Sequence, residues 1–269
     1  MRIAASSLGC PAWTLEDILR RFPECGLDAV EFRGIAGGLD VTVLPEFTSG
    51  LAASARLLGD AGLAVTGIGS SIRLCDPAAR EAGLEEARRT IPVALGLGAP
   101  SIRVFGGGPL AEDGSNRAEL VKIGTDCLKA ILDIPGAGRV DWLLETHDHW
   151  LTVSDLRSVV DPVGARNAGV LWDIAHTLRR TGETPGATIA GYGALIRNTH
   201  VKDAAGREPD APYVLPGTGV LPLAEAVRAL KAAGYGGALS LEHEKRWNPE
   251  LPEPEVVYPV FARWAKQFV

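Results

Sequence analysis

The chain has 269 residues, of which 46% are hydrophobic, and its 27 Lys and Arg against 33 Asp and Glu give a net charge of −6. The length suits one (β/α)8 barrel, which typically has about 250 residues. The mildly acidic balance argues against a surface built to hold nucleic-acid phosphates, and no apolar stretch approaches the ~18 residues that a membrane span needs. We therefore expect no nucleic-acid or membrane partner.

Eight apolar, β-branched runs along the chain are typical of buried strands, and segments with helical spacing separate them. Regular alternation of strands and helices favours a parallel sheet, and eight such units favour closure into a barrel. We therefore predict an α/β protein made of a single (β/α)8 TIM barrel over residues 1–269. The predicted strands are Ile3–Ser6, Ala29–Phe32, Val65–Gly69, Ile102–Phe105, Trp142–Glu145, Val170–Asp173, Ile196–His200 and Ala238–Glu242.

Local signals mark the ends of the intervening helices. The segment Thr14-Leu-Glu-Asp17 has the form of a capping box that opens the first helix. Pro23 and Pro92 interrupt helical patterns, and each is predicted to end or kink its helix. The stretch 204–222 is rich in Gly and Pro and is long for a connection, which indicates a lid or a pocket wall. Further predicted helix starts are Asp76-Pro77, Ser154-Asp155 and Pro222-Leu-Ala-Glu225.

The four cysteines lie far apart and form no C-x-x-C pair. Separate thiols of this kind are typical of a reducing compartment. The apolar run that follows Met1 ends at Pro11 and is too short for a secretory signal. These features predict a cytoplasmic protein.

Four strand-like runs in the second half end in acidic or imidazole groups: Glu145 in WLLETHDH, Asp173 in VLWDIAH, His200 in IRNTHVKD and Glu242 in ALSLEHE. The carboxyl ends of barrel strands meet at one rim, where the active sites of this architecture lie. Three carboxylates and one imidazole suit one divalent ion, either Mn2+, Mg2+, Co2+ or Zn2+. Without a cation, the gathered carboxylates would repel one another. The spacing therefore predicts a metal-dependent enzyme.

Other polar and aromatic residues near the same strand ends are candidates for substrate binding. All five histidines either are a predicted ligand or follow one within four residues. A solvated surface role or a packing role is the alternative for each candidate. The turn Pro216-Gly-Thr-Gly219 could offer backbone N–H groups to a phosphate, although most such turns are only turns. The candidates are Trp13, Glu31, His147, His176, Lys202 and Arg207.

Nearly the whole chain resembles the xylose-isomerase-like TIM-barrel superfamily of sugar and sugar-phosphate isomerases and epimerases. The resemblance implies that Glu145, Asp173, His200 and Glu242 hold one divalent metal. It further implies that Glu145 and Glu242 exchange protons with the substrate through a metal-bound enediolate, while His176 orients a substrate oxygen. The motifs that carry it are Ser7-Leu-Gly-Cys10, Asp28-Ala-Val-Glu31-Phe-Arg33, Glu145-Thr-His147, Trp172-Asp173-Ile-Ala-His176, His200-Val-Lys-Asp203 and Leu241-Glu242.

The chain departs from the ketose 3-epimerases of this superfamily at one point. Where those enzymes place an Arg six residues after the metal His, this chain has Gly206, and Arg207 follows it. Dehydratases of the inosose and dehydroshikimate types share the metal set and are the alternative activity. An endonuclease-IV-like repair enzyme or a non-catalytic carbohydrate-binding barrel fits less well. We expect a small carbohydrate or polyol substrate, and the sequence leaves homo-oligomer formation open.

Overall fold

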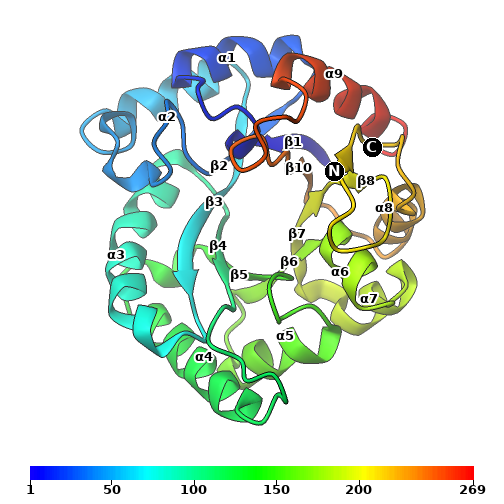
Figure 1. Cartoon of the computed structure of the whole chain (residues 1–269). Helices are drawn as coiled ribbons and strands as arrows, with labels where there is room; N and C mark the ends of the chain where they lie inside the picture. Colours follow the sequence, from blue (N-terminus) through cyan, green and yellow to red (C-terminus); the bar gives the residue numbers. More distant parts are fainter.

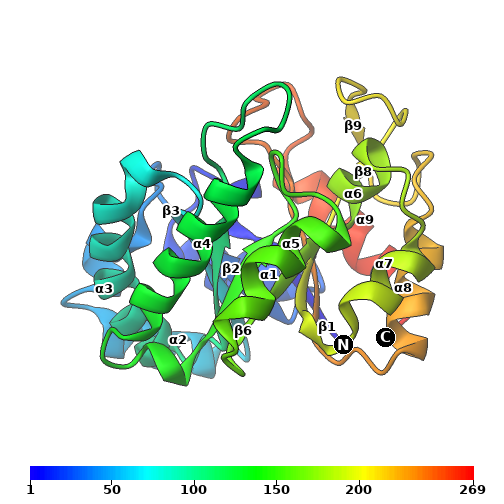
Figure 2. The same cartoon turned by 90° about the horizontal axis from the view of Figure 1, so that it is seen from below.

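Eight parallel strands close into a barrel with helices around it (Figures 1 and 2). The structure is a computed structural model that describes all residues from Met1 to Val269. The predicted TIM-barrel fold is confirmed. Both termini lie close together in the two views. Around the barrel the strands follow the order β1 (Arg2–Ser6), β10 (Ala238–Leu241), β7 (Ile196–Val201), β6 (Ala168–Asp173), β5 (Asp141–Glu145), β4 (Ser101–Phe105), β3 (Ala64–Arg73) and β2 (Ala29–Phe32).

All eight predicted strands are present, and seven of them differ from their predicted bounds by one to four residues at an end. The largest difference is at β3, which continues to Arg73 with a register shift against β4 after Gly69. The predicted long loop is present and includes a small antiparallel pair, β8 (Asp203–Ala204) and β9 (Tyr213–Val214).

Nine α-helices surround the barrel, and none of them is both long enough and apolar enough to cross a bilayer. Their outer ring is visible in Figure 1. The helices are α1 (Leu15–Glu24), α2 (Leu51–Asp60), α3 (Arg80–Leu97), α4 (Arg117–Leu132), α5 (Val153–Val160), α6 (Ile174–Arg180), α7 (Pro185–Tyr192), α8 (Leu223–Ala232) and α9 (Pro254–Ala265).

The helix signals give a mixed outcome. The capping box at α1 is confirmed, because the Asp17 amide donates to the Thr14 hydroxyl at 3.2 Å and the Asp17 carboxylate accepts from the Thr14 amide at 3.2 Å. Helix α5 is capped by Thr152 rather than by Ser154. Of the two outcomes predicted for Pro92, an end of the helix is wrong, because α3 continues to Leu97, and a kink stays a prediction. The burial of the α3 face around Pro92 offsets the hydrogen bond that proline removes.

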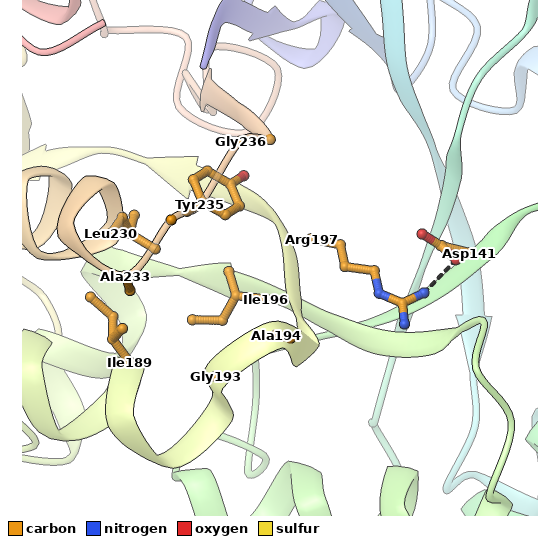
Figure 3. Close-up of a pocket in the computed structure, with 12 residues that line it drawn as sticks. Asp141, Ile189, Gly193, Ala194, Ile196, Arg197, Leu230, Ala233, Tyr235 and Gly236 are labelled. Carbon is orange, nitrogen blue, oxygen red and sulfur yellow. Dashed lines mark hydrogen bonds and ion pairs between the residues drawn. The ribbon is translucent and has the colours of Figure 1, made fainter.

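The opposite ends of the barrel differ in character. At the amino ends of β5, β7 and β10, a cavity of about 430 Å³ is lined by apolar side chains such as Ile189 and Leu230, with Tyr235 and the Asp141–Arg197 ion pair beside them (Figure 3). The predicted metal ligands lie at the carboxyl ends of the strands, on the other rim. The chemistry of the molecule is therefore to be sought at that rim.

Candidate metal centre

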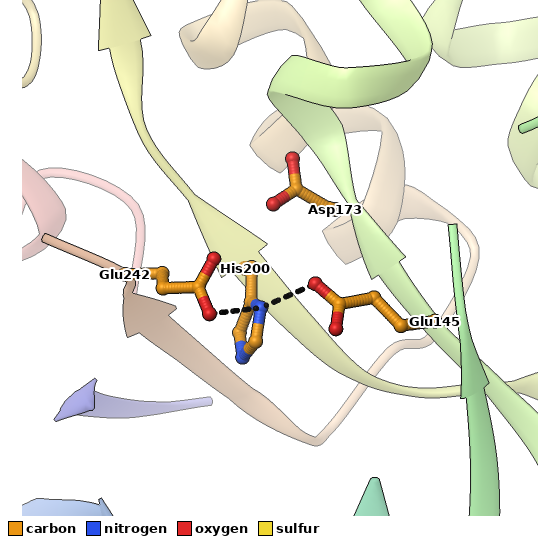
Figure 4. Close-up of side chains that lie close together, drawn as sticks. All are labelled: Glu145, Asp173, His200 and Glu242. Carbon is orange, nitrogen blue, oxygen red and sulfur yellow. Dashed lines mark hydrogen bonds and ion pairs between the residues drawn. The ribbon is translucent and has the colours of Figure 1, made fainter. Parts of the chain in front are cut away.

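The structure brings the four predicted ligands together. Glu145 and Asp173 are the last residues of β5 and β6, His200 is the next to last residue of β7, and Glu242 directly follows β10. One ligand atom from each of the four residues lies within 4.8 Å of the others, and all four side chains are buried (Figure 4). Strand ends that are 97 residues apart in sequence thus supply a compact set of three carboxylates and one imidazole.

A fifth residue fixes the orientation of the imidazole. His200 Nε2 donates to Glu31 Oε1 at 2.8 Å, and the other Glu31 oxygen accepts from the Asn198 amide at 2.8 Å. Nδ1 of His200 then faces Glu145 Oε1 at 3.0 Å and Glu242 Oε1 at 3.4 Å. A carboxylate on the far nitrogen is the usual support of a metal-binding histidine, so Nδ1 is the atom available to an ion.

The donor atoms fit a divalent cation. Glu145 Oε2 and Asp173 Oδ2 are buried and accept no hydrogen bond of good geometry, and their nearest polar neighbours are the cations of Arg103 at 3.2 Å and Lys202 at 2.9 Å. Buried carboxylate oxygens without a hydrogen-bond partner are costly, and coordination to an ion satisfies them. Three carboxylates with one imidazole form a hard to borderline set of the kind that Mg2+, Mn2+, Co2+ and Zn2+ accept. The cluster can therefore bind one metal ion.

Lys202 contributes a positive charge beside this cluster. Its ammonium lies 2.9 Å from Asp173 Oδ2, 2.5 Å from Glu242 Oε2 and 2.7 Å from Glu244 Oε1, and the side chain is buried. Burial alone would lower the pKa of Lys202, but the three carboxylates outweigh it and hold that pKa well above the ordinary value. Lys202 therefore keeps its charge next to the predicted ligands.

Arg103 is a site residue that the sequence prediction missed. Its Nε lies 3.2 Å from Glu145 Oε2, its Nη1 donates to the Ser70 carbonyl at 2.8 Å, and its guanidinium stacks 3.8 Å from the centroid of the Phe105 ring. Burial would raise the pKa of Glu145, but His200 and Arg103 together lower it to about 2. Alternation along β4 places residues 103 and 105 on one face, and this was the available signal.

Two histidines line the space next to the cluster. The rings of His147 and His176 lie 4.9 Å apart, and the His147 ring also lies 4.8 Å from Phe105. His176 Nδ1 donates to the Thr146 carbonyl at 3.1 Å, which leaves Nε2 to accept from Lys202 at 3.3 Å. Burial lowers the pKa of His176 and outweighs the opposing effect of Asp173, so its imidazole is neutral at pH 7.

The remaining candidates lie elsewhere. Trp13 is buried edge-on against Phe22 and Tyr258, at centroid distances of 6.3 and 5.9 Å. Arg207 is exposed on the loop between β8 and β9. For both residues, substrate contact stays a prediction.

The turn 216–219 has an internal partner. The Gly217 and Gly219 amides each donate to Asp203 Oδ2 at 2.9 Å. These amides are therefore not free for a phosphate, because the buried carboxylate of Asp203 already accepts from both, and the favoured expectation that this is only a turn is confirmed.

A cavity of about 250 Å³ opens beside the cluster and gives small molecules access to it. Two of the four predicted ligands form part of its wall, and Trp247, which is 57% exposed, stands at its edge. The lining residues are Leu8, Arg33, Arg103, Phe105, Glu145, His147, Glu242, Glu244 and Trp247.

The sequence profile of the family described as "Xylose isomerase-like TIM barrel" matches residues 19–266. The chain belongs to this family. The predicted resemblance is thereby confirmed. No protein among the curated sequences matches the chain.

Solved structures share the fold at low identity. The probable 3-DHS dehydratase AsbF of Bacillus anthracis is 15% identical with a TM-score of 0.81, and the similarity covers 99% of each chain. A D-psicose 3-epimerase is 17% identical, with a TM-score of 0.77 over 100% of this chain and 99% of its own. The IOLI protein, solved with a zinc atom, is 19% identical, with a TM-score of 0.77 over 100% and 96%.

Proposed function

We propose that this protein is a divalent-metal-dependent isomerase or epimerase that acts on a sugar, a sugar phosphate or a related polyol ketone. The observation that carries the proposal is the buried set of Glu145, Asp173, His200 and Glu242, whose ligand atoms lie within 4.8 Å of one another beside a cavity. A divalent ion held there, such as Mn2+, Mg2+, Co2+ or Zn2+, supplies positive charge and open positions for substrate oxygens.

The two glutamates are suited to opposite halves of a proton exchange. Glu145 and Glu242 both line the cavity, and both approach the same imidazole nitrogen from different strands, β5 and the end of β10. One of them takes a proton from the carbon beside the substrate carbonyl, and the other returns a proton to the resulting enediolate. Return to the opposite face gives epimerisation, and return to the neighbouring carbon gives isomerisation.

Neighbouring side chains are placed to hold the substrate. Lys202 has three N–H donors and Arg103 has a guanidinium, and both are fixed by buried partners next to the glutamates. The neutral His176 ring accepts through Nε2, while His147 and Phe105 form an aromatic wall. Donors that are held rigidly in this way favour one orientation of the bound substrate.

A dehydratase is the second candidate, and the position of Lys202 favours it. An ammonium held 2.5 Å from Glu242 is a charged hydrogen-bond donor next to a proposed base, where it can hold a leaving hydroxyl. Removal of the same carbon-bound proton, followed by protonation and loss of a β-hydroxyl, gives an enone and water. Isomerase and dehydratase therefore share the first step and differ in the product.

The test combines metal analysis with solvent exchange. Mass spectrometry counts metal per chain in the native protein, in Glu242→Gln and in the control Glu250→Gln, whose carboxylate is exposed on the loop after β10. Each protein is incubated in D2O with ketoses, inososes, sugar phosphates and 3-dehydroshikimate. We expect one ion per chain and deuterium uptake beside a carbonyl in the native and control proteins, and loss of uptake in Glu242→Gln.

Two results separate the outcomes of this test. Loss of water from the substrate with a rise in enone absorbance would assign the dehydratase activity instead. A native protein that binds no metal after reconstitution, and exchanges no substrate proton, would refute both activities.

A further inference from the structure

Arg33 is a buried cation for which the proposed reaction has no use. Arg33 is only 7% exposed, and it directly follows Phe32, the last residue of β2. Of the three buried Lys and Arg side chains, Lys202 and Arg103 form ion pairs with predicted ligands, whereas no carboxylate oxygen lies within 4.0 Å of the Arg33 guanidinium. Its one side-chain hydrogen bond goes from Nη2 to the Ser71 hydroxyl at 2.9 Å.

The backbone holds Arg33 firmly at this place. Its amide donates to the Ser7 hydroxyl at 2.8 Å, and the same hydroxyl donates to the Gly34 carbonyl at 2.6 Å. The chain then turns through Gly34 with φ of 94°. Arg33 is therefore a fixed part of the wall rather than a side chain that swings in from the surface.

Arg33 and Arg103 approach each other over one glycine. A Cβ at Gly69 would lie 2.7 Å from Cδ of Arg33 and 3.0 Å from Nη2 of Arg103, so this glycine makes room for both side chains. Like charges at such positions repel, and burial together with Arg103 lowers the pKa of Arg33 to about 10, against the weaker opposing effect of the more distant Glu86, Glu242 and Glu145. Glu145 is paired with Arg103 but does not reach Arg33.

Both arginines line the cavity beside the predicted metal ligands. Arg33 also borders a second hollow, with Ser71, Arg73 and Glu86, although no oxygen of Glu86 comes within 4.0 Å of its guanidinium. The cavity therefore has carboxylates on one side and an unpaired guanidinium on another. A guanidinium binds oxyanions through paired N–H donors, and it does so most strongly where water is excluded.

From this arrangement we infer that the substrate is anionic, and that Arg33, with Arg103 beside it, binds its carboxylate or phosphate group. The inference rests on the proposed function and narrows its substrate class to a sugar acid, a sugar phosphate or another acidic polyol ketone. It assigns the anion to Arg33 in the wall of the cavity and not to the exposed Arg207.

The test uses three ligands with one carbon skeleton: D-tagatose, D-tagatose 6-phosphate and D-tagaturonate. Calorimetry measures their binding to the metal-loaded native protein, to Arg33→Gln, to Arg33→Lys and to Arg207→Gln. The control is Arg88→Gln, which removes an exposed arginine on α3. We expect the native protein to bind at least one of the two anions more tightly than the neutral sugar. Arg33→Gln should weaken the binding of that anion about 10- to 100-fold, as expected for a lost charged hydrogen bond, and leave the affinity for D-tagatose unchanged. The preferred anion then distinguishes phosphate from carboxylate.

Several results would overturn the inference. Equal affinity of the native protein for all three ligands would do so without any variant, which covers the case in which Arg33→Gln fails to fold. An equal loss of anion affinity in Arg33→Gln and Arg88→Gln would also overturn the inference. A loss of anion affinity confined to Arg207→Gln would overturn it as well. Metal content and deuterium uptake are measured on the same samples. Deuterium uptake into D-tagatose without tighter binding of either anion would retain the proposed function and reject this inference. Tight binding of an anion to Arg33 without deuterium uptake would retain this inference and reject the proposed function.

Discussion

Asp203 provides a sharp test of how the long loop after β7 is held in place. Its buried carboxylate accepts four backbone amides: Oδ2 from Gly217 and Gly219 at 2.9 Å each, and Oδ1 from Ala204 at 2.9 Å and Leu221 at 3.4 Å. Asp203→Asn keeps the shape but replaces one acceptor oxygen with an NH2 group. Two charge-assisted hydrogen bonds are then lost, and donors face donors.

The expected cost follows from that count. At about 1.5 kcal/mol for each hydrogen bond to a charged group, the low end of the usual range, two lost bonds destabilise the protein by about 3 kcal/mol. For a chain of this size, that corresponds to a fall in Tm of roughly 6–12 °C. Denaturant unfolding measures the change in the free energy of unfolding, and hydrogen exchange reports on the amides of Gly217 and Gly219.

The matched control is Asp210→Asn, because Asp210 is exposed on the same loop. We expect it to change stability by less than about 0.5 kcal/mol. If Asp203→Asn unfolds at the same denaturant concentration as the native protein, with both glycine amides equally protected, then the carboxylate does not hold the loop and the argument fails.

Three further outcomes follow from the structure. Divalent metal at 100 times its Kd should raise the free energy of unfolding by about 2.7 kcal/mol, a chelator should reverse this, and Asp173→Asn should show neither effect in a thermal melt. Gly106→Ala should destabilise by about 1–3 kcal/mol or more, since its Cβ would lie 2.0 Å from the Trp150 ring, whereas Gly138→Ala meets open space and should be near neutral in the same denaturation assay. A maleimide at pH 7 should label only the half-buried Cys25 in the native protein, and it should react slowly because burial raises the pKa of this thiol. Mass spectrometry should find four labels after denaturation. Rapid labelling of a second thiol in the native protein would contradict the buried positions of the other three cysteines.

The sequence alone was sufficient for the barrel and for the four-residue cluster. The strands are short apolar runs, and their spacing along the chain reflects one strand–helix unit after another, so local pattern determined both their number and order. Glu145, Asp173, His200 and Glu242 sit at or just beyond strand ends, and closure of a parallel barrel brings strand ends to one rim. The convergence of these residues therefore followed from the fold class.

Only the tertiary structure decided how the charges pair. Arg33, Arg103 and Lys202 are similar in sequence terms, each an isolated cation at or near the end of a strand. The closed barrel gives Lys202 three carboxylates and Arg103 one, and it leaves Arg33 with none. Pairing depends on distances of 2.5–3.2 Å between side chains from neighbouring strands of the closed barrel that are far apart in sequence, and no local pattern encodes such distances.

The same distinction applies at Pro92 and at the turn 216–219. A proline in a helical pattern predicts an end or a kink from backbone chemistry alone, yet packing of the buried residues around Pro92 lets α3 continue to Leu97. From the sequence alone, the glycine amides of the turn could donate to a ligand. In the structure they donate to Asp203, which lies fourteen and sixteen residues earlier in the chain. Local sequence determined which groups this protein offers, and long-range packing determined which of them are left free for a ligand.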